Sequence, residues 1–73
     1  MHVYYYKSSV GIFRILPYRE GFLLEIDRIM CNTYQDPEDA AEDVKMHATG
    51  YYGWDKLKGT EEAPADLSGW TFL

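Results

Sequence analysis

The segment that most constrains the fold is YQDPEDAAEDVKMHATG, because it predicts a single amphipathic helix in the middle of the chain. Asp36 is a favourable N-cap residue, and Pro37 suits the first helical position, where its missing N–H would have no partner. The two acidic residues that follow place negative charge at the positive end of the helix dipole. We therefore expect a helix over residues 37–48, capped by Asp36 and ended by Gly50 in the left-handed conformation.

The predicted helix has two contrasting faces. Its apolar face consists mostly of small residues, namely Ala40, Ala41, Val44, His47 and Ala48. Small side chains allow a helix to lie close to a sheet, so we expect this face to pack on a sheet face that carries Phe22, Leu24 and Ile26. The acidic residues Glu38, Asp39, Glu42 and Asp43 occupy the opposite face, together with Lys45. A solvated surface is the simpler interpretation of this acidic face, and a docking face for a basic partner is the alternative.

The half of the chain before the helix has the pattern of short strands. Strands are expected over residues 3–7, 12–16, 22–26 and 29–34, with a turn at SSVG, a loop at PYREG and a tight turn after Ile26. In VYYYK, Tyr5 must face away from the tyrosines on either side of it.

Pro17 is expected to bracket the PYREG loop because it lacks a backbone donor. The pattern does not decide the inward face of the last strand: either Ile29 and Cys31 or Met30 and Tyr34 point inward.

The C-terminal part of the chain is too apolar for a solvent-exposed tail. Residues 51–57 are compatible with a short helix, KGTEEAP with a mobile acidic loop, and PADLSGW with one turn before a last extended piece. A helix with an alanine-rich face cannot cover both sides of a sheet, so we expect residues 51–72 to fold back over the sheet face, or edge, that the helix leaves open. The predicted fold is α+β: a three- to four-stranded antiparallel meander, one main helix and this returning segment, in a single domain over residues 1–73.

Composition and charge narrow the function classes. The 73 residues include one cysteine, so an internal disulfide is impossible and a reducing compartment is favoured. No stretch approaches the roughly 18 apolar residues of a membrane span, and we expect a soluble cytoplasmic protein without a leader or membrane association. Twelve acidic and seven basic residues give a net charge of −5, which disfavours binding to nucleic acid.

The order GIFRILP, GFLLEID, YQDPEDAAEDV, TGYYGWDKL and PADLSGW resembles a group of small bacterial proteins of unknown function. The resemblance implies a self-contained fold and no known activity. One departure lies in the turn after Asp27, where Arg28 and Ile29 replace small or polar residues and leave the hairpin register open. Three strands before a helix also resemble, in architecture only, the arm domains of phage-type integrases and the plant AP2 DNA-binding domain.

The chain offers little material for catalysis. Cys31, His2 and His47 lack the close spacing of a zinc site, so neither a metal nor another cofactor is expected. We interpret His47 as a structural residue and Cys31 as a small buried hydrophobe. No convergent carboxylate pair suggests acid–base chemistry, so no catalytic residue is assigned and the protein is not expected to be an enzyme.

Two hypotheses of function remain. In the first, the protein is a small interaction module or accessory protein that binds an unknown protein or a second copy, the latter through the first strand. Its candidate binding residues are exposed aromatics, namely Tyr5, Tyr51, Tyr52 or Trp54. The alternative is a nucleic-acid-binding module whose exposed sheet face uses Arg14, Arg19 and Lys7. The acidic composition favours the first hypothesis.

Overall fold

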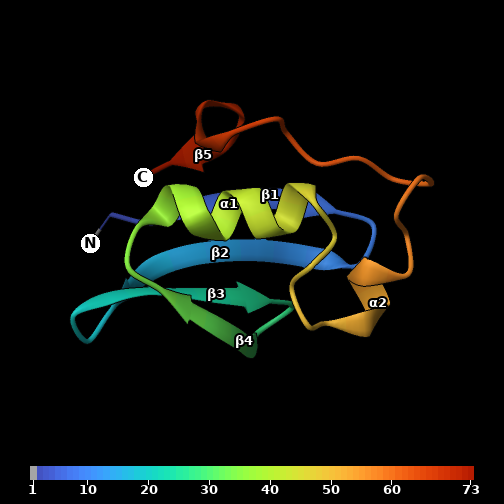
Figure 1. Cartoon of the computed structure of the whole chain (residues 1–73). Helices are drawn as coiled ribbons and strands as arrows, with labels where there is room; N and C mark the ends of the chain where they lie inside the picture. The colour runs from blue at the N-terminus through green and yellow to red at the C-terminus, as the bar shows by residue number, and fades with distance from the viewer. Residues whose placement is uncertain (1) are drawn as a thin grey trace.

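A computed structural model, which describes residues 2–73, shows five antiparallel strands in one open sheet with one main helix across one face (Figure 1). The α+β fold class is confirmed. The strands are β1 (Tyr4–Ser8), β2 (Gly11–Tyr18), β3 (Gly21–Ile26), β4 (Ile29–Tyr34) and β5 (Thr71–Phe72). The sheet order is β4-β3-β2-β1-β5, so the first four strands form the predicted meander and the fifth comes from the C-terminal segment. The helical elements are α1 (Pro37–Lys45), α2 (Tyr52–Asp55) and the 3-10 turn η1 (Leu67–Gly69).

The register of β1 and β2 divides the tyrosines between the two sheet faces. Tyr4 lies opposite Ile15 and Tyr6 opposite Phe13, while Tyr5 lies opposite Arg14. Phe13 and Ile15 are fully buried under α1, so Tyr4 and Tyr6 also point toward the helix. Tyr5 therefore points to the other face of the sheet, as alternation along a strand requires.

Pro17 lies inside β2, opposite Phe22, rather than at the boundary of a loop, so the predicted loop was too long. Strand β1 pairs with β2 only as far as Ile15. Beyond that point β2 is an edge strand on its β1 side, where a residue without an N–H is tolerated. The turn between β2 and β3 consequently shrinks to Arg19 and Glu20.

A bulge in the pairing of β3 and β4 explains why the inward face of β4 could not be assigned. The register shifts between Leu24 and Glu25, so that Leu24 lies opposite Asn32 but Glu25 lies opposite Met30. Cys31 is the extra residue, and both Cys31 and Tyr34 pack against the core. Neither strict alternation was correct, because a bulge reverses the facing of the residues that follow it.

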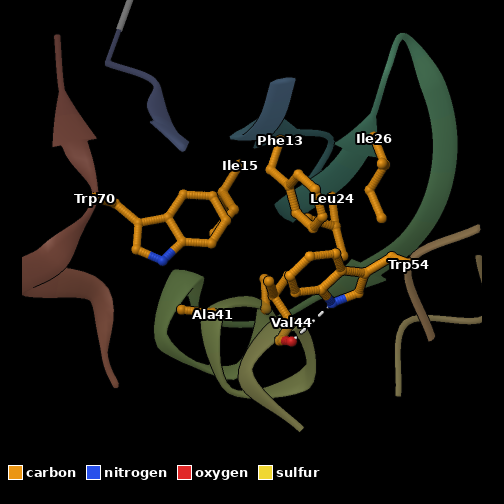
Figure 2. Packing of buried hydrophobic residues seen from close by; sticks show 9 residues of the cluster. Phe13, Ile15, Leu24, Ile26, Ala41, Val44, Trp54 and Trp70 are labelled. Atoms are coloured by element: carbon orange, nitrogen blue, oxygen red, sulfur yellow. Dashed lines mark hydrogen bonds between the residues drawn. The ribbon is translucent and has the colours of Figure 1, made fainter. Parts of the chain in front are cut away.

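Helix α1 packs where the sequence predicted, with Ala40, Ala41 and Val44 buried against Leu24 and Ile26 (Figure 2). It begins at Pro37 behind Asp36, but the Asp36 side chain makes no capping hydrogen bond. The predicted side-chain cap is therefore wrong, although the N-cap position is right.

The helix also ends earlier than predicted. His47, with φ of 54°, occupies the left-handed position that ends α1, whereas Gly50, which is left-handed as expected with φ of 86°, lies beyond the end of the helix. The His47 N–H bonds the Val44 carbonyl and the Ala48 N–H bonds the Asp43 carbonyl, which is the Schellman pattern. The His47 ring stacks on Trp54 at 4.4 Å between centroids, and its Nε2 lies 2.8 Å from the Glu61 carbonyl oxygen. These contacts stabilise a left-handed residue that is not glycine.

The C-terminal segment covers the helix side of the sheet and one sheet edge. Trp54 of α2 is fully buried, stands edge-on to Phe13, and donates from Nε1 to the Val44 carbonyl at 2.9 Å. Trp70 enters the same core after η1, as Figure 2 shows. Strand β5 then pairs with Tyr4 and Tyr5 of β1. The expectation that this segment covers an open edge is confirmed, whereas the face opposite the helix stays bare.

The acidic loop before η1 is held to the rest of the molecule by hydrogen bonds. The Ser9 backbone N–H and hydroxyl both donate to the Glu61 carboxylate, and they hold the pKa of that carboxyl below its usual range. The Tyr6 hydroxyl donates to the Glu62 carbonyl at 3.1 Å. No helix among the described residues combines the length and apolar character needed to cross a membrane.

Candidate interaction surface

The sheet face opposite α1, here called the outer face, carries large apolar side chains without a cover from the described chain. Strand register and alternation assign to it Val3, Tyr5, Lys7, Ile12, Arg14, Leu16, Tyr18, Leu23, Glu25, Met30, Thr33, Thr71 and Leu73. Ile12, Met30 and Leu73 are 49%, 58% and 66% exposed, although each is strongly apolar. Only the centre is shielded, since Leu23 is buried by its neighbours. An antiparallel sheet that faces water normally presents polar residues there, so this surface is unusually apolar.

Two adjoining hollows lie on the outer face and share the side chains of Ile12 and Arg14. One, of about 520 Å³, lies beside Val3, Tyr5 and Leu73 near the chain termini. The other, of about 640 Å³, extends toward the β3–β4 turn and is lined by Gly11, Ile12, Arg14, Glu25, Asp27 and Arg28. Both hollows are open to solvent, so they are contours of a surface and not an enclosed substrate cavity.

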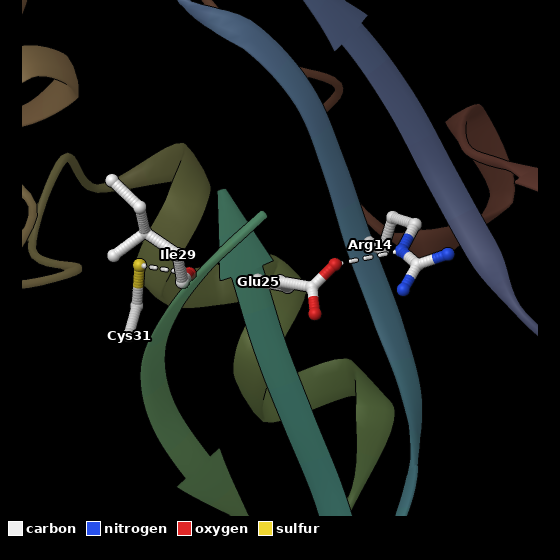
Figure 3. A network of polar contacts seen from close by, with 4 residues as sticks. All are labelled: Arg14, Glu25, Ile29 and Cys31. Atoms are coloured by element: carbon white, nitrogen blue, oxygen red, sulfur yellow. Dashed lines mark hydrogen bonds and ion pairs between the residues drawn. The ribbon is translucent and has the colours of Figure 1, made fainter. Parts of the chain in front are cut away.

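An ion pair stands in the middle of this surface. The Nε of Arg14 on β2 lies 2.8 Å from Oε1 of Glu25 on β3, and Figure 3 shows the two side chains pointing toward each other with the helices behind the sheet. The Arg14 side chain is 45% exposed and that of Glu25 is 14% exposed. Within residues 2–73, the two Nη groups of Arg14 and the second oxygen of Glu25 have no hydrogen-bond partner. The pair therefore retains both donor and acceptor capacity for a further contact.

The β3–β4 turn at the end of this surface is conformationally strained. Asp27 and Arg28 have φ of 51° and 67°, which residues other than glycine adopt only at a cost. Gly11 lies beside them with φ of 123°, and a Cβ at that position would come within 2.9 Å of the Asp27 side chain. The close approach explains why glycine occupies position 11. The hairpin register that the sequence left open is set by the pairing of Ile26 with Ile29.

Strand β4 is the sheet edge far from β5, and its own side chains occupy some of its backbone groups. The Asn32 side-chain oxygen accepts from the Thr33 N–H at 2.9 Å, and the Cys31 thiol donates to the Ile29 carbonyl at 3.3 Å (Figure 3). Burial raises the pKa of the Cys31 thiol, which disfavours the reactive thiolate. Together with the bulge, these contacts blunt the edge against the addition of another strand.

The structure brings together only part of the residue set expected to form a binding site. Tyr5 and Arg14 lie opposite each other on the outer face. Tyr51 and Tyr52 lie at α2, on the helix side of the sheet, where Tyr51 is half-buried and Tyr52 is 76% exposed. Trp54 is fully buried, so the expectation that it is an exposed aromatic is wrong. Its ring fills the space between β2 and α1.

The motif TGYYGWD builds a structural turn. The Asp55 carboxylate accepts from the Thr49 N–H at 3.0 Å, the Thr49 hydroxyl at 2.8 Å and the Gly50 N–H at 2.9 Å. The Thr49 hydroxyl oxygen in turn accepts from the Tyr51 N–H at 3.0 Å. The network fixes the start of α2 and so the position of Trp54 in the core.

The remaining polar groups offer little for chemistry. The hydroxyl of Tyr34 donates to the Asp43 carboxylate at 2.8 Å, and burial followed by this bond raises the pKa of Tyr34. Asp43 of the acidic helix face is therefore engaged within the fold. Among residues 2–73, no group of three histidine, cysteine or acidic side chains is placed to hold a metal ion.

Sequence reasoning placed Glu25 on the exposed sheet face but missed Ile12 and Met30 as parts of the surface. The signal was present, because Ile12 and Leu16 alternate with Phe13 and Ile15, so that β2 is apolar on both of its faces.

A comparison of the chain with protein-family models, curated proteins and solved structures found no match. These comparisons give no support to the resemblance to a small bacterial group.

Proposed function

We propose that the protein is a small non-enzymatic interaction module or accessory protein, and that the outer face is its contact surface. The observation that carries this proposal is the set of apolar side chains left open on that face, with Ile12, Met30 and Leu73 about half exposed or more. Such a patch, with tyrosine and arginine among it, is typical of contact surfaces between proteins. A cytoplasmic setting fits the single free cysteine.

Nucleic-acid binding by the same face is the weaker candidate. Arg14, Lys7 and Arg19 remain the cations that such binding would use, but Arg14 already pairs with Glu25. Asp27 adds a second carboxylate beside that pair. Binding to duplex DNA depends on neutralising phosphates, and a face with interspersed anions serves that purpose poorly. We expect no salt-sensitive micromolar binding in a fluorescence-anisotropy titration with labelled duplex DNA.

Site-specific photo-crosslinking tests the proposal directly. A benzoylphenylalanine placed at Ile12 reports on the outer face, and the same residue at Glu42 reports on the exposed side of α1 as a matched control. Both variants are made in the full-length chain, expressed in cells that naturally contain the protein, and irradiated there. We expect discrete protein adducts from position 12 and none from position 42. An equal pattern from both positions, or no adduct from position 12, would refute a dedicated contact role for the outer face.

A further inference from the structure

The distribution of charge over the two layers of the molecule indicates which partner fits the outer face. Residues 2–34, which form the first four strands, contain four cations and three anions. Residues 35–73, which build the helical layer and β5, contain three cations and nine anions. The negative charge is thus concentrated away from the outer face, whose own charges nearly balance.

A second copy of the chain would exploit this separation. Two copies packed outer face to outer face would bring the near-balanced layers together and leave both acidic layers on the outside. Packed sheets lie about 10 Å apart, and each acidic layer lies beyond its own sheet. The acidic layers would therefore be separated by more than the Debye length of about 8 Å at physiological ionic strength. Charge repulsion between the two copies would be largely screened.

The Arg14–Glu25 pair is self-complementary, which a two-fold arrangement requires. In such a dimer a residue that contacts a second residue across the interface is contacted by it in return. The free Nη groups of Arg14 in one copy can donate to the free carboxylate oxygen of Glu25 in the other, and the reverse contact forms at the same time. Both side chains are already held in place by their internal bond of 2.8 Å. The additional contacts would need little further ordering of these side chains.

The area of the outer face is sufficient for a weak specific dimer. The 27 residues of the five strands, at a rise of about 3.4 Å and a strand spacing of about 4.8 Å, give a projected face of about 440 Å² per copy. Two copies then bury about 900 Å² before side-chain relief is counted, which lies at the low end of the range for specific interfaces. A face of this size is consistent with dissociation in the micromolar range and not with an obligate dimer.

The two sheet edges are poor alternatives for self-association. Strand β5 pairs with Tyr4 and Tyr5 of β1, so only the three residues at the end of the first strand are left as a free edge on that side. The bulge and the side-chain bonds at Asn32 and Cys31 blunt the β4 edge. The outer face is the larger surface left for a second copy.

We propose that the partner of the outer face is a second copy of this chain, in a two-fold dimer in which Arg14 of each copy bonds Glu25 of the other. This inference rests on the proposed function, because it names the occupant of the same surface. It also assigns Ile12 and Met30 to the apolar part of the interface, on either side of the central charged residues.

Analytical ultracentrifugation of the purified full chain tests the dimer, with two charge-reversal variants that distinguish contacts between copies from contacts within one copy. The wild-type protein is expected to shift from monomer to dimer as its concentration rises through the micromolar range. Arg14→Glu alone and Glu25→Arg alone should each remain monomeric, because like charges then meet across the two-fold axis. An equimolar mixture of the two variants should form a heterodimer, since two acidic side chains then face two basic ones.

The mixture is the decisive sample because an effect on folding alone cannot produce association between two different variants. Far-UV circular dichroism confirms that each variant is folded, and Glu42→Gln on the far layer is a control that should dimerise like wild type. A monomeric wild type, or a mixture that stays monomeric, overturns the proposed dimer. Crosslinks from position 12 to a different protein would then leave the interaction module standing, whereas their absence would remove both proposals.

Discussion

Replacing each tryptophan by phenylalanine separates the value of an indole hydrogen bond from that of the ring. Trp54 and Trp70 are 0% and 6% exposed, and both belong to the core shared by β2 and α1. Trp54 donates from Nε1 to the Val44 carbonyl at 2.9 Å. The Nε1 of Trp70 is buried without a partner among the described residues. The two substitutions remove the same atoms, but Trp54→Phe removes a hydrogen-bonded N–H group and Trp70→Phe removes an unpaired one.

The expected difference follows from these contacts. Phenylalanine lacks two of the buried ring carbons of tryptophan as well as Nε1, and at about 0.8 kcal/mol for each carbon the lost burial destabilises either variant by about 1.6 kcal/mol. Trp54→Phe also loses a hydrogen bond of about 1 kcal/mol, giving about 2.6 kcal/mol in total. Trp70→Phe instead removes an unpaired donor whose burial costs about 1 to 3 kcal/mol, so its net effect is at most about 0.6 kcal/mol.

Urea denaturation followed by far-UV circular dichroism measures both free energies of unfolding on the same scale. Trp54→Phe should be less stable than Trp70→Phe by about 2 kcal/mol or more. In a domain of this size, that difference corresponds to about 8 to 16 °C in melting temperature. If Trp70→Phe lost as much stability as Trp54→Phe, the two indole N–H groups would be equivalent and the reasoning from their hydrogen bonds would be refuted.

The other predictions concern single polar contacts and the C-terminal segment. Asp36→Ala should lower the free energy of unfolding by less than about 0.5 kcal/mol, below the roughly 1 kcal/mol of a bonded N-cap, and a larger loss in urea denaturation would show that the side chain does cap α1. Asp55→Ala should lower it by about 3 kcal/mol, because three donors lose their acceptor; an effect below about 1 kcal/mol would contradict the turn network. Because the pKa of Tyr34 is raised in the folded protein, the stability that Tyr34 contributes is fully present below its unfolded pKa of about 10. This stability is lost as the pH rises further. Thermal melts of Tyr34→Phe should therefore decline less steeply above pH 10 than those of wild type, and parallel declines would exclude Tyr34 as a source. A chain truncated after Lys58 should show no cooperative melting, since it lacks Trp70, the Glu61 contacts and β5; an equally stable truncated chain would show that the segment is dispensable.

The elements that were predictable from the sequence are those specified by local patterns. Proline at the first helical turn and the apolar alternation of residues 22–26 depend on near neighbours in the chain, and the structure reproduces both. The start of α1 and the facing of β3 were therefore correct. The short helix at α2 and the turn before β5 also followed from local residues.

The features that were missed depend on contacts between distant residues. His47 adopts the left-handed conformation because Trp54 and Glu61 hold its ring, and neither partner is visible from the helix sequence. The β4 bulge likewise depends on how β4 meets β3, which single-strand alternation cannot reveal. Part of the candidate surface was nevertheless accessible, since Tyr5 and Arg14 were named and the two-sided apolar pattern of β2 could have added Ile12.

The outer face is left exposed, whereas the edges of the same sheet are partly protected. A half-exposed position such as Ile12 or Met30 contributes little to the core, so a polar residue there would fold as well and would interact better with water. The sheet edges, by contrast, are partly protected from contact: β5 pairs with part of β1, and side-chain hydrogen bonds occupy backbone groups along β4. Apolar side chains are retained on the outer face although folding does not require them there. Retaining them there is consistent with selection for contact with another molecule, and the paired charges at its centre favour a partner that presents the same pair in reverse.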